Sequence, residues 1–172
     1  MKKYGLILLL FLVHHNCLTL EKTNIRPQTS NIPKCIQDKI DTTNITDIYD
    51  IINISCNYTA EYLEFAEKNN INRGEANCVG YAQLCSAIAN KLISKSNLNA
   101  SCHPVVGYIF YNQTNLCDLL KTIVPTKYKN FVKDHDFVEL SYQDSIYYYD
   151  PSLYDYIGNM CLTIQPKSKE KV

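Results

Sequence analysis

The 172-residue sequence has no tryptophan, few glycines and methionines, and no net charge. Basic and acidic residues number 17 each, so the charge balance gives no electrostatic reason to expect nucleic-acid binding. The sequence also lacks a C-x-x-C motif, and its cysteine spacings match no zinc module, so we predict neither a metal nor a cofactor. Because 46% of the residues are hydrophobic, the chain can bury a core and is not expected to be disordered.

The first residues have the pattern of a secretory signal, because Lys2 and Lys3 precede an apolar run over residues 6–13. This run is too short to span a bilayer comfortably. We therefore expect residues 1–19 to be a removable signal peptide and the protein to be secreted, periplasmic or on the cell surface. Cys17 lies four residues after the run, and a lipid anchor at this residue is the alternative way for the chain to meet a membrane.

The rest of the chain is predicted to form one domain. Residues 20–34 are polar and contain two prolines, which predicts a linker. Residues 35–165 form the predicted domain, and the lysine-rich residues 166–172 are predicted to be a disordered tail.

Seven cysteines follow Cys17, and export would allow disulfides to persist among them. The odd number leaves at least one thiol outside any pairing within the chain. We predict that Cys78 is a free thiol and that Cys85 packs in the core. Some of the remaining five are predicted to be bridged: Cys35, Cys56, Cys102, Cys117 and Cys161.

Apolar residues at spacings of three and four along residues 82–92 predict a helix that ends near Ser94. The asparagine-rich residues 69–77 predict a loop before this helix. Cys78 then lies in the first helical turn, where unpaired amide N–H groups and the positive end of the helix dipole favour a thiolate. Helices are also predicted over residues 36–54, with an interruption at 41–43, and over residues 58–68, with Thr59 as a cap.

After residue 99 the hydrophobic period changes to that of strands, over residues 103–111, 135–142 and 146–149. The last two strands are joined by a turn at residues 143–145 and predict an antiparallel hairpin that Asp150 and Pro151 end. A short helix over residues 115–122 and a final strand over 160–164 complete the prediction. Helices followed by strands indicate an α+β fold, with N-terminal helices and a central Cys-bearing helix packed on an antiparallel sheet.

Two histidines remain after the signal, His103 and His135. His135 begins the first strand of the hairpin and Asp150 ends the second, so the two residues lie at the same open end. A carboxylate there can hold the imidazole through Nδ1 and leave Nε2 for the Cys78 thiol. His103 is expected to be structural. If the helix and the hairpin pack together, the three residues form a cysteine acyl-transfer triad.

Three motifs, N-C-V-G-Y-A, H-D-F-V-E-L and Y-Y-Y-D-P-S, resemble in this order the transglutaminase-like superfamily. The resemblance covers residues 63–153. It implies a transglutaminase-like, cysteine proteinase-like fold with Cys78, His135 and Asp150 as a papain-like catalytic triad, and it places Glu139 on a family position. Phe137 departs from the pattern, because the family usually has tryptophan there.

The oxyanion donors are less well determined by the motifs. The backbone N–H of Cys78 is one expected donor. The second family donor varies in position, and Asn72, Asn77 or a tyrosine are the alternatives that the sequence leaves open. Glu139 is expected to support the hairpin or to face solvent.

The resemblance implies a cysteine enzyme that cleaves or transfers a peptide or protein amide through a thioester on Cys78, and the signal pattern implies that this enzyme is exported. Hydrolysis is the preferred reaction, and a peptide or protein amide is the expected partner. The competing hypothesis is a disulfide-stabilised secreted binding module on the same fold, in which the triad is catalytically idle.

Overall fold

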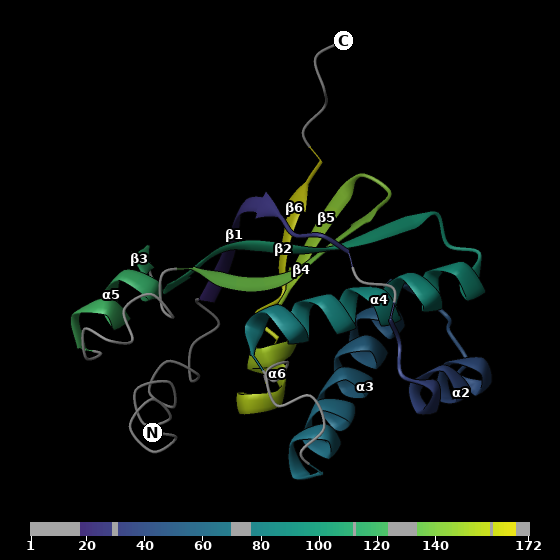
Figure 1. Ribbon diagram of the computed structural model, residues 1–172. Coiled ribbons are helices and arrows are strands. Elements are labelled where there is room, and N and C mark those ends of the chain that lie inside the picture. The colour runs from purple at the N-terminus through teal and green to yellow at the C-terminus, as the bar shows by residue number, and fades with distance from the viewer. Residues whose placement is uncertain are drawn as a thin grey trace.

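The computed structural model describes residues 18–28, 31–69, 77–111, 113–123, 134–158 and 160–167. Over these residues the chain is an α+β fold, as predicted, in which a curled antiparallel sheet lies against helices (Figure 1). The described elements, in chain order, are β1 (Leu18–Ile25), α2 (Lys34–Thr42), α3 (Ile48–Lys68), α4 (Cys78–Ser96), β2 (Ala100–Tyr111), β3 (Thr114–Asn115), α5 (Leu116–Ile123), β4 (His135–Tyr142), β5 (Ser145–Tyr149), α6 (Pro151–Ile157) and β6 (Thr163–Pro166).

The sheet has the strand order β1-β2-β4-β5-β6, and the short β3 pairs with β2 beside this path. Every pairing is antiparallel. The predicted hairpin of β4 and β5 is confirmed, with Gln143 and Asp144 in the turn. Figure 1 shows α4 directly against β2 and β4, with α3 on the far side of α4.

The central position of α4 explains its composition. Ten of its residues are buried, on nearly every side of the helix, because the sheet covers one side and α3 covers another. Small residues such as Ala82 and Ala89, which are fully buried, allow the helix to approach its neighbours closely. The sequence predicted one apolar face, and packing between two layers explains why residues outside that face are buried as well.

The N-terminal helices differ from the prediction at two points. The predicted interruption is present but lies later than residues 41–43, because α2 continues to Thr42 and α3 begins at Ile48. The separate helix predicted from residue 58 is wrong, since α3 is continuous and Asp47 caps it by accepting from Tyr49 N and Asp50 N. Thr59 is no cap, because its hydroxyl donates to the Ser55 carbonyl one turn earlier at 2.7 Å.

The segment predicted as a linker, residues 20–34, contains most of strand β1 and the first residue of α2. β1 pairs with β2 along its length, with a register shift between Lys22 and Asn24. Gly107 allows this pairing, because a Cβ atom there would lie 1.9 Å from the Glu21 carbonyl oxygen. The polar composition reflects an edge strand, whose residues are mostly exposed, and the prediction of a linker was wrong here.

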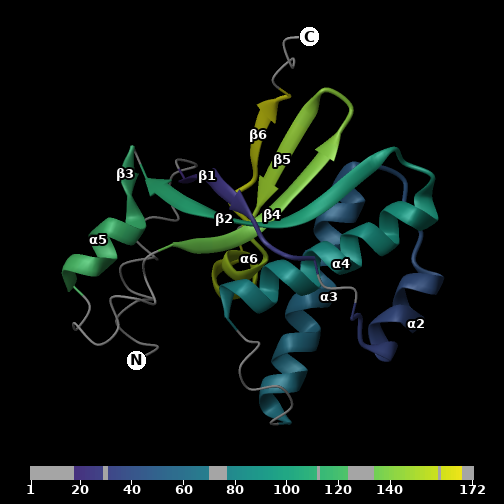
Figure 2. The ribbon, with the colours of Figure 1, turned by 45° about the horizontal axis from the view of Figure 1, so that its top comes forward.

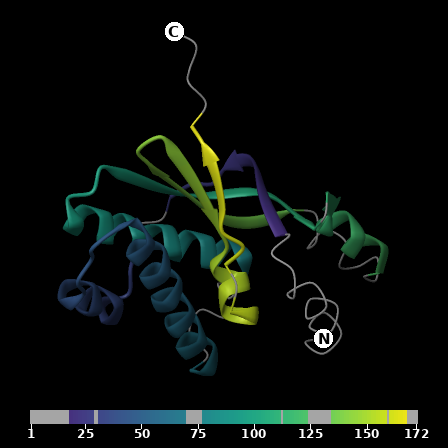
Figure 3. The same ribbon diagram turned by 180° about the vertical axis from the view of Figure 1, so that it is seen from behind.

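The hairpin leads into α6, a helix that was not predicted from the sequence. Asp150 caps this helix, Pro151 is its first residue, and Gly158 follows it with a φ of 69°. Proline at the start and glycine after the end are typical helix boundaries, and they are the signal that the sequence reading missed. The final strand begins at Thr163, later than the predicted residues 160–164. Figure 3 shows α6 beneath the end of β5.

Several predictions fall outside the described residues. They concern residues 1–17 with Cys17, the loop at residues 70–76 with Asn72, residues 124–133 and the end of the tail at 168–172. None of the helices that the structure describes combines the length and apolar character needed to cross a membrane.

Candidate active site

Cys78 is the first residue of α4, as the sequence predicted. Asn77 precedes it as the N-cap, and its side-chain oxygen accepts from Gly80 N at 3.0 Å. The Cys78 thiol is partly exposed and lies among the amide N–H groups that begin the helix. The fold therefore presents this thiol at the surface, at the positive end of the central helix dipole.

His135 and Asp150 meet at the open end of the hairpin. Nε2 of His135 lies 2.5 Å from Oδ2 of Asp150. Cys78 lies near enough to the same imidazole to contribute to raising its pKa. The three residues that the sequence proposed as a triad are therefore neighbours, although they come from α4, the start of β4 and the end of β5.

The roles of the ring nitrogens differ from the prediction. The expectation was that Nδ1 would meet the carboxylate and Nε2 would meet the thiol, but Nε2 meets Asp150. Nδ1 is then the nitrogen that remains for Cys78. A topological argument places the residues at one end of a hairpin, but it does not determine how the ring is turned about its side-chain bonds.

Charge sets the protonation of this pair. Burial by itself lowers the pKa of His135, but the charge and hydrogen bond of Asp150, together with the Cys78 thiol, raise the pKa well above its ordinary value. Burial likewise tends to raise the pKa of Asp150, but His135 and hydrogen bonds from the start of α6 lower it below its ordinary value. The pair therefore favours an imidazolium held by a carboxylate.

Asp150 is fixed by contacts other than His135. It is fully buried, and its Oδ1 accepts from Ser152 N at 2.9 Å, Ser152 Oγ at 2.7 Å and Leu153 N at 3.0 Å. One carboxylate oxygen thus caps α6 while the other holds the imidazole. The helix that the sequence reading missed is therefore part of what positions the candidate triad.

The structure adds a second buried carboxylate beside Cys78. Asp136 is 1% exposed, and its Oδ2 lies 3.9 Å from Cys78 Sγ. Arg26 pairs with it through Nε at 2.6 Å and through Nη2 at 3.3 Å. Strand alternation could have indicated Asp136, since it shares a face with Val138 and Leu140. Arg26, more than 100 residues earlier, gave no sequence signal.

The other candidates lie elsewhere. His103 is exposed on β2 opposite Glu139, whereas His135 lies opposite Gly107, four residues further along β2. Four residues separate the two positions by about 13 Å along the strand. Glu139 is buried and pairs with Lys22 of β1. It therefore supports the sheet and does not face solvent, which was the other expected alternative. Asn77 is described as the cap of α4, and Asn72 lies outside the described residues.

No disulfide joins the cysteines in the described part of the chain, from Cys35 to Cys161. The predicted bridges are therefore not formed in this structure. Cys85 is fully buried, which confirms its predicted packing role. Cys56, Cys85 and Cys102 lie in the core between α3, α4 and the sheet, where a reduced cysteine packs as a small apolar residue.

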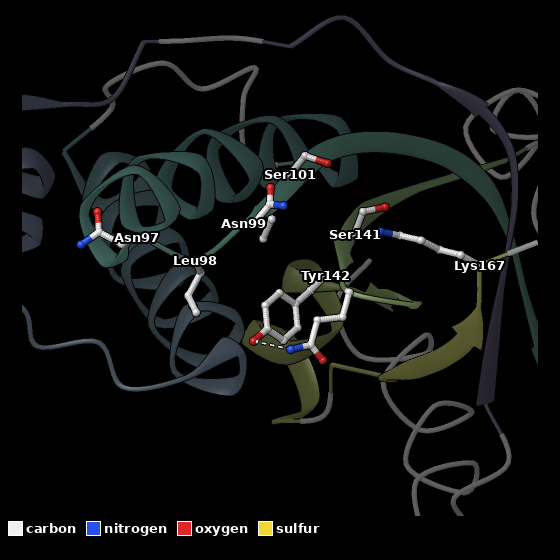
Figure 4. Close-up of a pocket in the computed structure, with 9 residues that line it drawn as sticks. Asn97, Leu98, Asn99, Ser101, Ser141, Tyr142 and Lys167 are labelled. Carbon is white, nitrogen blue, oxygen red and sulfur yellow. Dashed lines mark hydrogen bonds between the residues drawn. The ribbon is translucent and has the colours of Figure 1, made fainter.

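A hollow of about 450 Å³ lies near the C-terminal end of α4 (Figure 4). It is lined by residues 97–101, residues 141–143 and Lys167, and Gln143 Nε2 donates to Tyr142 Oη there at 3.0 Å. This hollow is roughly 27 Å from Cys78 along the helix axis, at about 1.5 Å per residue. It contains no cysteine or histidine, so it carries none of the candidate chemistry.

The described residues include no group of three histidine, cysteine, aspartate or glutamate side chains that could hold a metal ion. Comparison of the chain with protein-family models, with curated proteins and with solved structures found no match. The functional argument therefore depends on the geometry around Cys78 and on the sequence motifs.

Proposed function

We propose that this chain is a transglutaminase-like cysteine enzyme that cleaves a peptide or protein amide through a thioester on Cys78. The observation that carries the proposal is the arrangement at the start of α4, where Cys78 lies beside His135 and Asp150 holds the same imidazole at 2.5 Å. In this arrangement the thiol can act as the nucleophile, the imidazole as the general base and the carboxylate as the group that orients the imidazole.

In the proposed reaction the Cys78 sulfur attacks the carbonyl carbon of the amide. The S–C bond forms, and the oxyanion is stabilised by backbone N–H groups at the start of α4, with that of Cys78 as the first donor. The C–N bond then breaks, and the leaving amine takes a proton from the His135 imidazolium. The product of this half-reaction is an acyl-enzyme thioester.

In the second half-reaction, His135 accepts a proton from water as the water oxygen attacks the thioester. The carboxylic acid is released and the Cys78 thiol is restored. An amine in place of water would give acyl transfer instead of hydrolysis. Asp150 keeps the ring oriented and stabilises its cationic form in both halves. Export remains part of the proposal and rests on the signal-like residues 1–19.

The test is labelling with a peptide that carries a thiol-reactive acyl group. We expect one labelled site, Cys78, and loss of labelling in Cys78→Ala. Cys35→Ala is the matched control, because Cys35 is the exposed cysteine on α2, and it should label like the parent. Peptide mapping by mass spectrometry identifies the site. A protein that is folded but unlabelled at Cys78 would instead support the idle binding module, whose expected disulfides are not formed among the described cysteines.

A further inference from the structure

The nucleophile lies between two buried carboxylates, each paired with a different cation. On one side Asp150 pairs with His135, and on the other Asp136 pairs with Arg26. Triad chemistry explains the first pair but does not explain the second. A carboxylate 3.9 Å from Cys78 Sγ would oppose the formation of a thiolate unless its charge were balanced.

Arg26 provides this balance. Its Nη2 donates to Asp136 Oδ2, the same oxygen that faces the Cys78 sulfur, and its Nε donates to Oδ1. The backbone holds Arg26 in place, because Arg26 N donates to the Pro104 carbonyl at 2.8 Å at the end of β1. Gln28, two residues later, donates to Ser86 of α4 at 3.1 Å, and Figure 2 shows this segment passing along α4.

We propose that Arg26 is a positioning residue for the nucleophile, which neutralises buried Asp136 and so allows Cys78 to ionise beside it. This inference rests on the proposed function of Cys78. β1 then has a role beyond closing the edge of the sheet, because it delivers a cation to the start of α4. Asp136 in turn fixes the guanidinium through two hydrogen bonds.

Other charged groups surround the first turn of α4 and stay unchanged in the test. Asp134 lies near Arg26, and Asp155 of α6 accepts from the Tyr81 hydroxyl at 2.5 Å. Among the residues that the structure describes, the charged groups come from the end of β1, from α3, from β4, from the end of β5 and from α6. These described groups are Arg26, Glu67, Asp134, His135, Asp136, Asp150 and Asp155.

The test measures the rate at which iodoacetamide alkylates Cys78 between pH 4 and pH 9, with a Cys35→Ser background to remove the exposed thiol. Arg26→Gln should move the midpoint of the rate profile to higher pH by about 1 unit, because Asp136 loses its partner. Asp136→Asn should move it to lower pH by about 1 unit, because an unbalanced guanidinium then faces the thiol. Circular dichroism establishes that each variant is folded.

Two further variants separate charge from structure. Arg26→Lys keeps the cation and should stay close to the parent profile, and the double variant Arg26→Gln with Asp136→Asn should return toward it. Both single variants break the same ion pair, so a purely structural role would move both profiles in the same direction. Shifts of the same sign, or no shift in either variant, would overturn the inference. A parent protein without reactivity at acidic pH would instead count against the proposed function itself.

Discussion

Cysteines occur in two contrasting regions of α4, one at its first residue and one two turns further along. Cys78 is partly exposed and lies between the pairs His135–Asp150 and Arg26–Asp136. Cys85 is fully buried, and its thiol donates to the Ser55 hydroxyl at 3.4 Å. The neighbours of the first thiol are charged, whereas the described neighbours of the second are hydroxyl groups and other thiols.

The surroundings of each region determine what a thiol can do there. In the interior, burial raises the pKa of Cys56 and of Cys102, because no solvent stabilises a thiolate. At Cys85 burial also tends to raise the pKa, but hydrogen bonds with neighbouring thiol and hydroxyl groups lower it below its ordinary value. Burial also raises the pKa of Tyr149, whose hydroxyl lies 3.6 Å from Cys102 Sγ. Cys56, Cys102 and Tyr149 therefore stay neutral and pack as core residues. At the start of the helix, the dipole and two cations provide the surroundings that the proposed nucleophilic role of Cys78 requires.

Replacing His135 should have the largest effect. His135→Ala is expected to lower kcat/KM for peptide amide hydrolysis by about 10²- to 10⁴-fold, the usual contribution of a general base. It should also remove the alkylation of Cys78 at acidic pH, because no imidazolium then faces the sulfur. His103→Ala is the control and should leave both measurements nearly unchanged. If His103→Ala is the variant that loses acidic reactivity, the catalytic histidine is assigned incorrectly.

The next effect is expected for Asp150→Asn. Asparagine caps a helix about as well as aspartate, so α6 should remain intact. A neutral amide cannot stabilise the imidazolium, and kcat should fall by at least about 10²-fold while Cys78 remains open to alkylation. Steady-state kinetics and alkylation of the same preparation measure both. Asp150→Ala should cost about 1 kcal/mol more in the free energy of unfolding, since the cap is also lost. Equal stability of the two variants would contradict this division of roles.

A smaller effect concerns stability against pH. The folded state raises the pKa of His135, so its contribution to stability is complete below the unfolded pKa and is lost as pH rises through the folded value. The folded state lowers the pKa of Asp150. The contribution of Asp150 to stability is therefore present above the unfolded pKa and is lost as pH falls through the folded value. Urea unfolding from pH 3 to pH 10 should show both losses in the parent. His135→Gln should lack the alkaline loss, and an unchanged profile would refute the linkage.

The smallest effect is expected in the interior region. Cys85→Ala removes one buried sulfur and should lower the free energy of unfolding by about 1 kcal/mol. Labelling of Cys78 by the acyl probe should not change, because Cys85 contacts Ser55 and not the candidate site. Denaturant unfolding and the labelling assay measure the two quantities. Loss of labelling in a folded Cys85→Ala protein would remove the distinction between the two regions.

Local patterns predicted the elements that they directly encode. Spacings of three and four predicted α4 with Cys78 at its start, alternation predicted β4, and the turn at residues 143–145 predicted the return strand β5. The hairpin argument brought His135 and Asp150 together, because strands joined by a short turn must share an open end. The same reading missed α6 and the strand at residues 18–25, whose polar sequence is stabilised by pairing with β2 and not by its own pattern.

The sequence by itself determined that Cys78, His135 and Asp150 are the candidates for chemistry, and it predicted the helix start and the two strand ends at which they lie. Only the tertiary structure decided which nitrogen of His135 faces Asp150, that Asp136 is buried against Cys78, and that Arg26 reaches Asp136. The physical reason is the range of the interactions. Hydrophobic periodicity and capping act over a few neighbouring residues, whereas the electrostatics of a buried site depend on distances between elements that are far apart in the chain and meet only when the sheet and helices pack.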